Sequence, residues 1–438
     1  MKSYIPATHD EQREMLERMG YQSIEDLFID IPASLRQKKP PTLPPPMAEA
    51  DVLRMMKAYA DDNDTAKPLF RGAGAYRHFI PSFISAMAQR GELLTAYTPY
   101  QFEMSQGLLQ AIFEFQTLIA RLTGMDASNA SVYDGATAAA EAMLMARDIV
   151  RKKKILVSAA LLPDVLATLR TYAPCVGLEL IEIPHADGVT DLLKVKENAN
   201  GAVGLIAASP NCFGIIEDTQ ALADAIHAEK GLMISYVNPI SLGLLKTPGA
   251  LGADIAVGDG QPLGIPLSWG GPLLGFMAAK QKVLRYLPGR IVGETVDGDG
   301  NRAYVLTLQA REQHIRREKA ASNICSNQAL CALMAGMYMT AMGPQGLREV
   351  AESCLQKAHY AAERIAKIPG MKMAYDRPFF LEFVIESEQS SMKIDEAVYN
   401  AGIVGGLPIS DHRILYCVTE MNTRDEIDRL VHTLEVIA

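Results

Sequence analysis

A short loop rich in hydroxyl and ring side chains is one feature of the chain that could take part in chemistry. Tyr97, Thr98, Tyr100 and Gln101 surround one proline in the stretch Leu94-Thr-Ala-Tyr-Thr-Pro-Tyr-Gln101. Hydroxyls, an amide and aromatic faces held at a fixed bend suit contacts to a small amino acid or a planar cofactor. The same residues also suit a structural turn before a helix, so both interpretations stay open.

A second polar feature is a run of basic residues. If this run is helical, His314 and Arg317 share a face with Arg311 and Glu318. Cations on one face suit a phosphate or an acidic partner, or else a salt-bridged hinge between domains. The run consists of Arg311, His314, Arg316, Arg317 and Lys319, with Glu312 and Glu318 among them.

A lone histidine ends the stretch Arg71-Gly-Ala-Gly-Ala-Tyr-Arg-His78. Its glycine spacing fails the dinucleotide-binding fingerprint, because Arg77 stands at the third glycine position and no strand precedes it. His78 is a candidate polar group near a substrate channel, and a structural role is the alternative.

The loop after residue 257 bears most directly on chemistry. In Val257-Gly-Asp-Gly-Gln-Pro-Leu-Gly-Ile-Pro-Leu-Ser-Trp-Gly-Gly-Pro272, an apolar strand runs into a loop rich in glycine and proline. Loops of this kind carry the lysine of enzymes that hold pyridoxal phosphate as a Schiff base. Gln261 occupies the place of that lysine. An amide cannot form this bond, so we expect no catalytic residue in this chain alone and no covalently bound cofactor.

Two further places agree with a lost cofactor site. Type I pyridoxal enzymes set an aspartate against the pyridine nitrogen, whereas Tyr236-Val-Asn-Pro239 carries a neutral asparagine at the expected place. Asp134-Gly-Ala-Thr137 opens a helix, and the free N–H groups of such a start suit a phosphate. Asp134 can equally cap a helix of the core. The vestigial site predicted here consists of Gly135, Ala136, Thr137 and Asn238.

Length and composition exclude several classes. The 438 residues, 49% of them hydrophobic, suffice for two or three domains. A net charge of −9 leaves no basic footprint for nucleic acid. Without a long apolar stretch or a signal peptide, we expect a cytoplasmic chain with no membrane contact. The 6 cysteines and 8 histidines show no metal-ligand spacing, so we expect reduced thiols and no metal.

The elements that must position these residues form three parts. Residues 1–65 combine amphipathic helices with clustered prolines and predict an N-terminal arm lying on another surface. Residues 66–325 alternate strands and helices and predict a parallel sheet covered on both faces. Residues 326–438 predict a helix followed by a small α+β domain. The expected strands of the sheet are 155–158, 178–183, 203–208, 232–237 and 255–257, and Gly124 should end a helix over 108–122.

A large parallel-sheet α/β domain, a small C-terminal α+β domain and an arm form the layout of the type I pyridoxal-phosphate-dependent transferase fold, which is the aspartate aminotransferase-like fold. A fold by itself says little about the reaction.

Four stretches carry a more specific resemblance. The first is the loop ending at Gln101, followed by Ser105-Gln-Gly107. The second is Thr123-Gly-Met-Asp-Ala-Ser-Asn-Ala-Ser131 with Gly135-Ala-Thr-Ala-Ala-Ala-Glu-Ala142. The third is the glutamine loop, and the fourth is Arg311-Glu-Gln-His-Ile-Arg-Arg-Glu-Lys-Ala-Ala-Ser-Asn-Ile-Cys325. Together they closely resemble glycine decarboxylase, the P-protein of the glycine cleavage system, over nearly the whole chain.

The resemblance implies a divided enzyme. In that family a single long chain or two separate chains do the work, and the amino-terminal half, called subunit 1 or α, typically has glutamine where the other half has lysine. It implies that pyridoxal phosphate is held by a lysine-bearing subunit 2, in an α2β2 complex. Glycine would lose CO2, and its aminomethyl group would pass to the lipoyl arm of the H-protein. Tyr97, Thr98, Tyr100, Gln101 and His78 would then line an active site shared with the partner.

Two alternatives belong to other classes. One is an independent pyridoxal enzyme that uses Lys246 or Lys280, which Gln261 argues against. The other is a non-catalytic regulatory or scaffold protein, for which the loop at Tyr97 to Gln101 has no obvious use.

Overall fold

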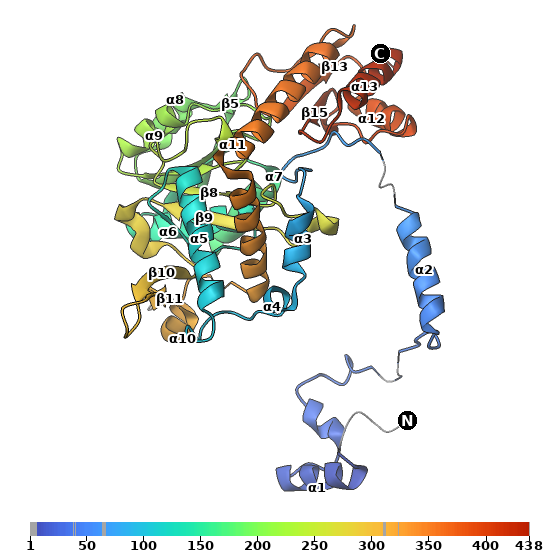
Figure 1. Cartoon of the computed structure of the whole chain (residues 1–438), viewed down its shortest axis with the longest axis vertical. Coiled ribbons are helices and arrows are strands. Elements are labelled where there is room, and N and C mark those ends of the chain that lie inside the picture. The colour runs from blue at the N-terminus through green and yellow to red at the C-terminus, as the bar shows by residue number, and fades with distance from the viewer. Residues whose placement is uncertain are drawn as a thin grey trace. The chain divides into compact units, whose positions relative to one another are not determined.

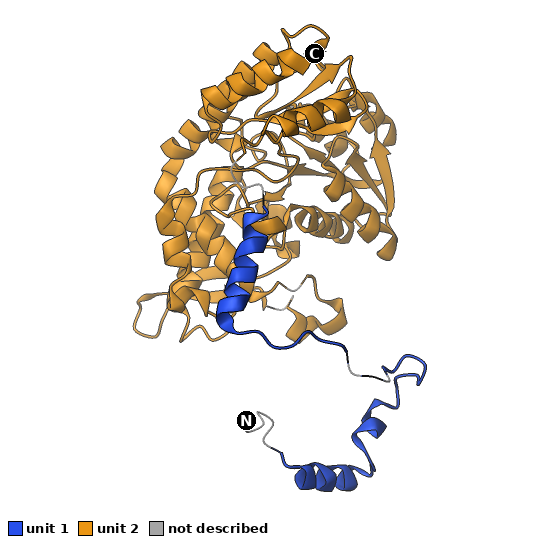
Figure 2. Cartoon of the chain, turned by 90° about the vertical axis from the view of Figure 1, so that its right-hand side faces the viewer, with its two compact units in different colours: residues 1–65 blue, residues 66–438 orange. Residues whose placement is uncertain are grey.

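The computed structural model describes residues 7–37, 39, 41–63, 67–309, 312–322 and 324–437. The chain divides into two units, Met1–Thr65 and Ala66–Ala438, coloured separately in Figure 2. Each unit is considered by itself. The division of residues 66–438 into a large and a small domain remains a prediction.

The first unit consists of short helices joined by extended chain. Its helices are α1 (His9–Met19), η1 (Ile24–Phe28) and α2 (Glu49–Asp61). Helix α1 begins at a capping box in which Thr8 Oγ1 accepts from Glu11 N and Glu11 Oε2 accepts from Thr8 N. Across these three helices only Leu16 is buried, so their apolar faces lie open.

A seven-stranded sheet organises the second unit. Its order is β1-β9-β8-β7-β6-β2-β3, and β8, β7, β6, β2 and β3 run parallel. The five predicted strands are confirmed, but the sheet is not wholly parallel, because β9 pairs antiparallel to β8 and β1 antiparallel to β9. The strands are β1 (Ala127–Ser128), β2 (Lys154–Ser158), β3 (Glu179–Ile183), β6 (Ala202–Ala208), β7 (Leu232–Tyr236), β8 (Ile255–Asp259) and β9 (Gly275–Ala279).

Helices cover both faces of this sheet, as predicted (Figure 1). Alternate residues of a strand face opposite cores: Ala256 packs with α5, α9 and α11, whereas Ile255 and Val257 pack with α6 and α7. Helix α5 ends at Gly124 with a φ of 66°, which confirms the predicted stop. The covering helices are α5 (Gln106–Thr123), α6 (Gly135–Val150), α7 (Pro163–Cys175), α8 (Leu192–Asn198), α9 (Thr219–His227) and α11 (Ser326–Ile365).

Several small elements interrupt this plan. The β10–β11 hairpin packs beside α5, and its pairing over Ile291–Thr307 was not predicted. Strand β10 is Ile291–Val296 and β11 is Arg302–Thr307. The others are α3 (Ser82–Ala88), α4 (Gly91–Leu94), β4 (His185–Ala186), β5 (Val189–Thr190), η2 (Ser241–Gly243), η3 (Ser268–Gly270), η4 (Gln281–Tyr286), α10 (Gln313–Arg316) and η6 (Arg317–Lys319).

Helix α11 leads into the C-terminal elements and bends at Gly343 and Pro344. A four-stranded antiparallel sheet of order β12-β13-β15-β14 follows, with a core of its own. The last helix begins at a capping box, where Thr423 N donates to Glu426 Oε2 and Glu426 N donates to Thr423 Oγ1. The elements are β12 (Met371–Met373), β13 (Glu382–Ser387), α12 (Ser391–Asn400), β14 (Leu407–Ser410), β15 (Arg413–Cys417) and α13 (Arg424–Ile437).

None of the helices in the part of the chain that the structure describes combines the length and apolar character needed to cross a membrane.

Candidate functional site

The vestigial site predicted from the sequence forms one region of the second unit. Strands β7 and β8 are parallel neighbours, so their carboxyl ends, Tyr236 and Asp259, reach the same edge of the sheet. The start of α6 meets them there, since Gly135 N donates to the Asp259 carboxylate. In open α/β sheets, ligands bind beyond the carboxyl ends of the strands.

Gln261 is a buried structural residue that is 2% exposed. Its Oε1 accepts from Tyr76 N at 3.0 Å, and its Nε2 donates to Tyr76 O at 3.0 Å and to Ile265 O at 2.8 Å. The amide thus pairs with both backbone groups of Tyr76, as a neighbouring strand would. A lysine ammonium has no acceptor and cannot replace the bond to Tyr76 N.

The start of α6 is closed by side chains of the chain itself. Asp134 Oδ1 accepts from Thr137 N at 2.7 Å, and Thr137 Oγ1 accepts from Asp134 N at 3.0 Å, which completes a reciprocal cap. Ala136, in the first turn of α6, is partly buried and packs against the core on this face of the sheet. A Cβ at Gly135 would lie 2.3 Å from the Tyr236 hydroxyl, so that hydroxyl already fills the space in front of the helix.

Asp259 supplies the anion that a helix start favours. Its carboxylate accepts from Gly135 N at 3.0 Å and from Gln261 N at 2.8 Å, and it is also hydrogen-bonded to the backbone of Leu274. Burial raises the pKa of this carboxyl to about 6, against the lowering effect of these bonds. At neutral pH, an internal carboxylate therefore stands where a phosphate would bind.

Pyridoxal phosphate does not fit the residues of this region. Asn238 Oδ1 accepts from Ile240 N at 2.9 Å, so it is engaged locally and carries no charge for a pyridine nitrogen. The cavity lined by Tyr76, Tyr236, Asn238 and Asp259 measures about 20 Å³. Such a volume holds about one water molecule, whereas ligand sites typically measure about 300 Å³ or more.

The lysines considered for an independent pyridoxal enzyme lie elsewhere. Lys280 Nζ donates to Gly124 O at 2.9 Å. Lys246 is exposed and lines a different cavity, beside Glu217. Neither lysine lines the filled cavity.

Tyr76 extends the network to the C-terminal sheet. Its hydroxyl donates to Glu382 Oε2 at 2.9 Å, and Ala73 N donates to Glu382 Oε1 at 2.6 Å. Burial raises the pKa of Glu382 to about 7. The segment from Ala73 to Tyr76 is thereby held between Gln261, in the loop after β8, and Glu382 on β13.

The tyrosine loop is mounted on α11 and exposed at its tip. Thr98 Oγ1 and Ser326 Oγ share a hydrogen bond of 2.7 Å. Tyr100 OH accepts from Arg290 Nη2 at 2.9 Å, and its ring lies edge-on to His314 with centroids 6.3 Å apart. Tyr97 is 81% exposed, and Gln101 is exposed as well.

Of the basic run, His314 contacts the tyrosine loop through the ring of Tyr100. Arg311 lies outside the described residues. The run is not one continuous helix, because α10 ends at Arg316 and Arg317 turns the chain with a φ of 53°. The condition for a shared face of His314 and Arg317, a single helix, is therefore not met. A cavity of about 1080 Å³ is lined by Arg316 and by four further cations, Arg147, Arg151, Arg285 and Lys319.

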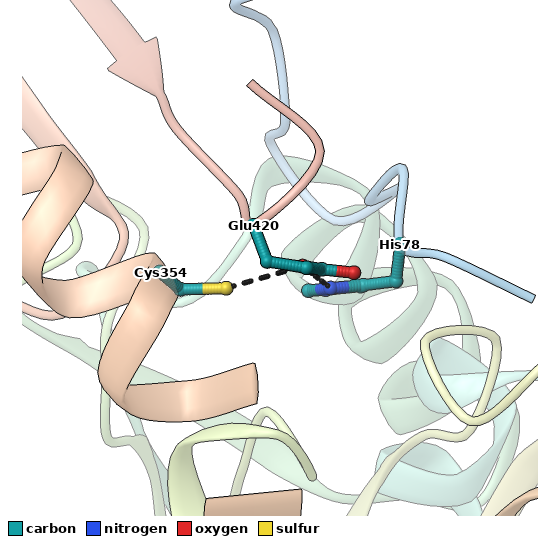
Figure 3. A group of neighbouring side chains, drawn as sticks. All are labelled: His78, Cys354 and Glu420. Carbon is teal, nitrogen blue, oxygen red and sulfur yellow. Dashed lines mark hydrogen bonds and ion pairs between the residues drawn. The ribbon is translucent and has the colours of Figure 1, made fainter. Parts of the chain in front are cut away.

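His78 lies in a group with Cys354 and Glu420 (Figure 3). His78 Nδ1 and Glu420 Oε2 are 2.7 Å apart, Cys354 Sγ donates to the same oxygen at 3.3 Å, and Phe79 N donates to Glu420 Oε1. Burial and the neighbouring Glu420 raise the pKa of the Cys354 thiol well above its usual value, so it stays a protonated donor. The group ties the segment at His78 to α11 and to the turn after β15.

Sequence reasoning missed three residues that organise these sites: Asp259, Arg290 and Glu420. Asp259 carried a usable signal, since a carboxylate two residues before the absent lysine, at the end of an apolar strand, must find buried partners. Arg290 and Glu420 carried none, because their partners stand 190 and 342 residues away in the sequence.

Comparison with known proteins gives concordant matches. The model of the glycine cleavage system P-protein family matches residues 2–434. A probable glycine dehydrogenase (decarboxylating) subunit 1 from Desulfitobacterium hafniense is 51% identical, with 98% of each chain covered. A crystal structure of glycine decarboxylase (P-protein) of the glycine cleavage system, in inhibitor-bound form, matches with a TM-score of 0.88 and 43% identity over 100% of both chains.

A more distant match confirms the fold alone. Aspartate aminotransferase from Thermus thermophilus superposes with a TM-score of 0.57 at 17% identity, covering 84% of this chain and 98% of that one. The predicted type I fold is therefore confirmed.

The hydrogen bonds of the buried Gln261 amide give a prediction about stability. Gln261→Leu leaves Tyr76 N, Tyr76 O and Ile265 O without their partner, and should lower the free energy of unfolding by about 3 kcal/mol or more. Urea unfolding measures the loss. The control is Gln220→Leu, which removes an exposed bond to Asp224 and should change stability by about 0.5 kcal/mol or less. Equal small losses in both variants would contradict the role of Gln261.

The Asp259 carboxyl gives a pH prediction. Its native pKa of about 6 lies above the ordinary aspartate value of 3.8, so between these pH values the native state keeps a proton that the unfolded state has lost. Its contribution to stability is therefore full below about pH 4, falls by about 3 kcal/mol as pH rises to about 6, and then levels off. Asp259→Asn should lack this component. Urea unfolding of both proteins from pH 4 to 7 measures it, and parallel curves would count against a raised pKa.

Proposed function

The chain belongs to the glycine cleavage system P-protein family, and from this membership we propose that it is the lysine-free subunit of glycine decarboxylase. The relatives that match over its whole length are named as subunit 1 of glycine dehydrogenase (decarboxylating), which implies a second subunit. In this role the chain completes the active site of its partner and is not active alone. The scaffold alternative gains no support from these matches.

The reaction proposed for the complex is the decarboxylation of glycine. Carbon dioxide leaves, and the remaining aminomethyl group passes to the lipoyl arm of the H-protein. Pyridoxal phosphate takes part in the chemistry of the complex, and we place it on the lysine of the second subunit. No step of the reaction runs through the filled cavity of this chain.

One observation carries this assignment. The amide of Gln261 is committed to Tyr76 and Ile265, and the Asp259 carboxylate occupies the start of α6. The lysine site and the phosphate site are thus both taken by side chains of the chain, around a cavity of about 20 Å³. A subunit with such an interior contributes through its surface.

The surface contribution proposed is the tyrosine loop, acting in trans. Tyr97 extends into solvent, whereas Thr98 and Tyr100 are held by Ser326 and Arg290. A hydrogen-bonding group on a rigid mount can line the glycine site of the partner without reorganising, which is what transition-state stabilisation requires. Gln101 adds an amide beside it. His78 would contribute indirectly, by fixing the position of the chain around residue 78, since its ring is buried against Glu420.

The basic residues are proposed to contact an anion or an acidic partner. His314 meets the Tyr100 ring edge-on, and Arg316 lines the cationic cavity, while Arg317 is exposed. The chain as a whole carries a net charge of −9, so a cavity with five cations against Glu141, Asp148 and Glu318 is a local exception. Such a contact should weaken with salt.

We propose an α2β2 assembly with the second subunit. The first unit supports this, because its helices leave large apolar side chains exposed and bury only Leu16. Obligate interfaces commonly exceed about 2,000 Å², and an arm of this kind supplies area of the needed character.

Cofactor content is the direct test of the proposed function. The chain purified alone should hold no pyridoxal phosphate, and borohydride, which fixes a pyridoxal group onto a lysine, should leave it unlabelled. Mixed with the companion chain, it should support exchange of CO2 with glycine, and all label should lie on the companion. Stoichiometric label on any lysine of this chain would overturn the assignment, as would full activity of the companion by itself.

The tyrosine loop gives a kinetic prediction. Tyr97→Phe and Tyr100→Phe in the complex should each lower the rate of glycine decarboxylation by a factor of about 100, because each removes a positioned hydroxyl. Assembly and the cofactor content of the companion should not change. Tyr399→Phe is the matched control, since Tyr399 is 46% exposed on α12 and should keep the full rate. Full rates in both loop variants would show that the loop is a structural turn.

A further inference from the structure

Trp269 is the only tryptophan of the chain and is 98% exposed. Tryptophan side chains bury about 150 to 250 Å² each and are highly buried on average in folded proteins. An indole left entirely in water forgoes that gain. In the isolated chain, the exposed indole therefore contributes no burial energy to the fold.

The backbone around Trp269 holds the indole outward. Ser268 has a φ of 36°, Trp269 a φ of 53° and Gly270 a φ of 99°, so three successive residues adopt left-handed conformations. For residues other than glycine these conformations cost energy and persist only where the surroundings impose them. We call Ser268–Gly271 the tryptophan turn.

The tryptophan turn stands on a rigid base. Gln328, which is 3% exposed on the first turns of α11, donates from Nε2 to Leu273 O at 2.9 Å and to Tyr133 O at 2.8 Å. Leu263 and Leu274, on either side of the turn, are fully buried. A fixed base beneath an exposed aromatic tip lowers the entropy cost of binding.

The same base carries the tyrosine loop. Thr98 is bonded to Ser326, which opens α11 two residues before Gln328. Tyr133, whose carbonyl accepts from Gln328, is itself 39% exposed. The start of α11 thus mounts two outward-facing segments, the tryptophan turn and the tyrosine loop.

We propose that the tryptophan turn is an anchor with which this chain docks onto the second subunit, the indole inserting into a pocket of that protein. The proposal rests on the proposed function, which requires such a subunit. Tryptophan and tyrosine dominate the energetic centres of protein interfaces. The shared base with Tyr97 and Thr98 makes the turn continuous with the surface proposed to reach the partner. The occupant is a distinct second subunit, since the relatives are named subunit 1, which implies another subunit.

A single tryptophan makes the inference directly measurable. The chain is produced with 5-fluorotryptophan, so that one fluorine reports on residue 269 even when the unlabelled companion has tryptophans of its own. In the isolated chain, the fluorine resonance should show the H2O/D2O isotope shift of an exposed indole. On adding the companion, the resonance should move and lose that isotope shift. Size-exclusion chromatography of the same sample shows whether the complex has formed.

Each outcome is decisive. A complex in which the fluorine stays exposed would overturn the anchor and leave the proposed function standing. Failure to form a complex would overturn both. An indole already shielded in the isolated chain would mean that another part of the chain covers it, or a second copy, and would also overturn the anchor.

A substitution tests the energetic role. Trp269→Ala should weaken the affinity for the companion by at least about 30-fold, as truncation of an interface hot spot does. Its thermal unfolding should match that of the wild type, because the side chain makes no buried contact at 98% exposure. Leu193→Ala, which removes another large exposed side chain at 69% exposure on α8, should leave affinity unchanged. Equal affinities of the tryptophan variant and the wild type would refute the anchor.

Discussion

The free N–H groups at the start of α6 are the constraint on which the interior of this protein depends. A helix start buried beside the ends of β7 and β8 must find acceptors, and its dipole favours a negative charge. A bound phosphate can meet that demand. Here Asp134 caps Thr137 N and the Asp259 carboxylate accepts from Gly135 N, so the demand is met by the chain itself.

The hydrogen bonds of Gln261 and Tyr76 are continuous with this contact between Asp259 and α6. Once Asp259 lies against α6, its second oxygen accepts from Gln261 N, and the Gln261 amide turns to the backbone of Tyr76. Tyr76 in turn donates to Glu382 on β13. The region beyond the ends of β7 and β8 is thus a hydrogen-bonded joint between the two sheets of the second unit. Adding a lysine to such a joint would break it without creating a site.

Because the interior cavity is filled, the groups that this chain can offer to another protein lie on its surface. The start of α11 is the platform, because Ser326 holds the tyrosine loop and Gln328 holds the loop that carries Trp269. Both segments combine exposed rings with a fixed backbone, which is how a subunit offers groups to another protein. The proposed role of the tyrosine loop and the proposed aromatic anchor therefore rest on one structural base, the start of α11.

The sequence by itself determined the features that depend on local pattern. Short apolar runs predicted the five parallel strands, and Gly124 predicted the end of α5. Tertiary structure decided the rest, because the deciding contacts join residues remote in sequence. It set Asp259 against Gly135, buried His78 against Glu420, placed Arg290 on Tyr100, and broke the basic run at Arg317. Periodicity carries no information about such partners, since a side chain's hydrogen-bond partner is chosen by the packing of whole elements.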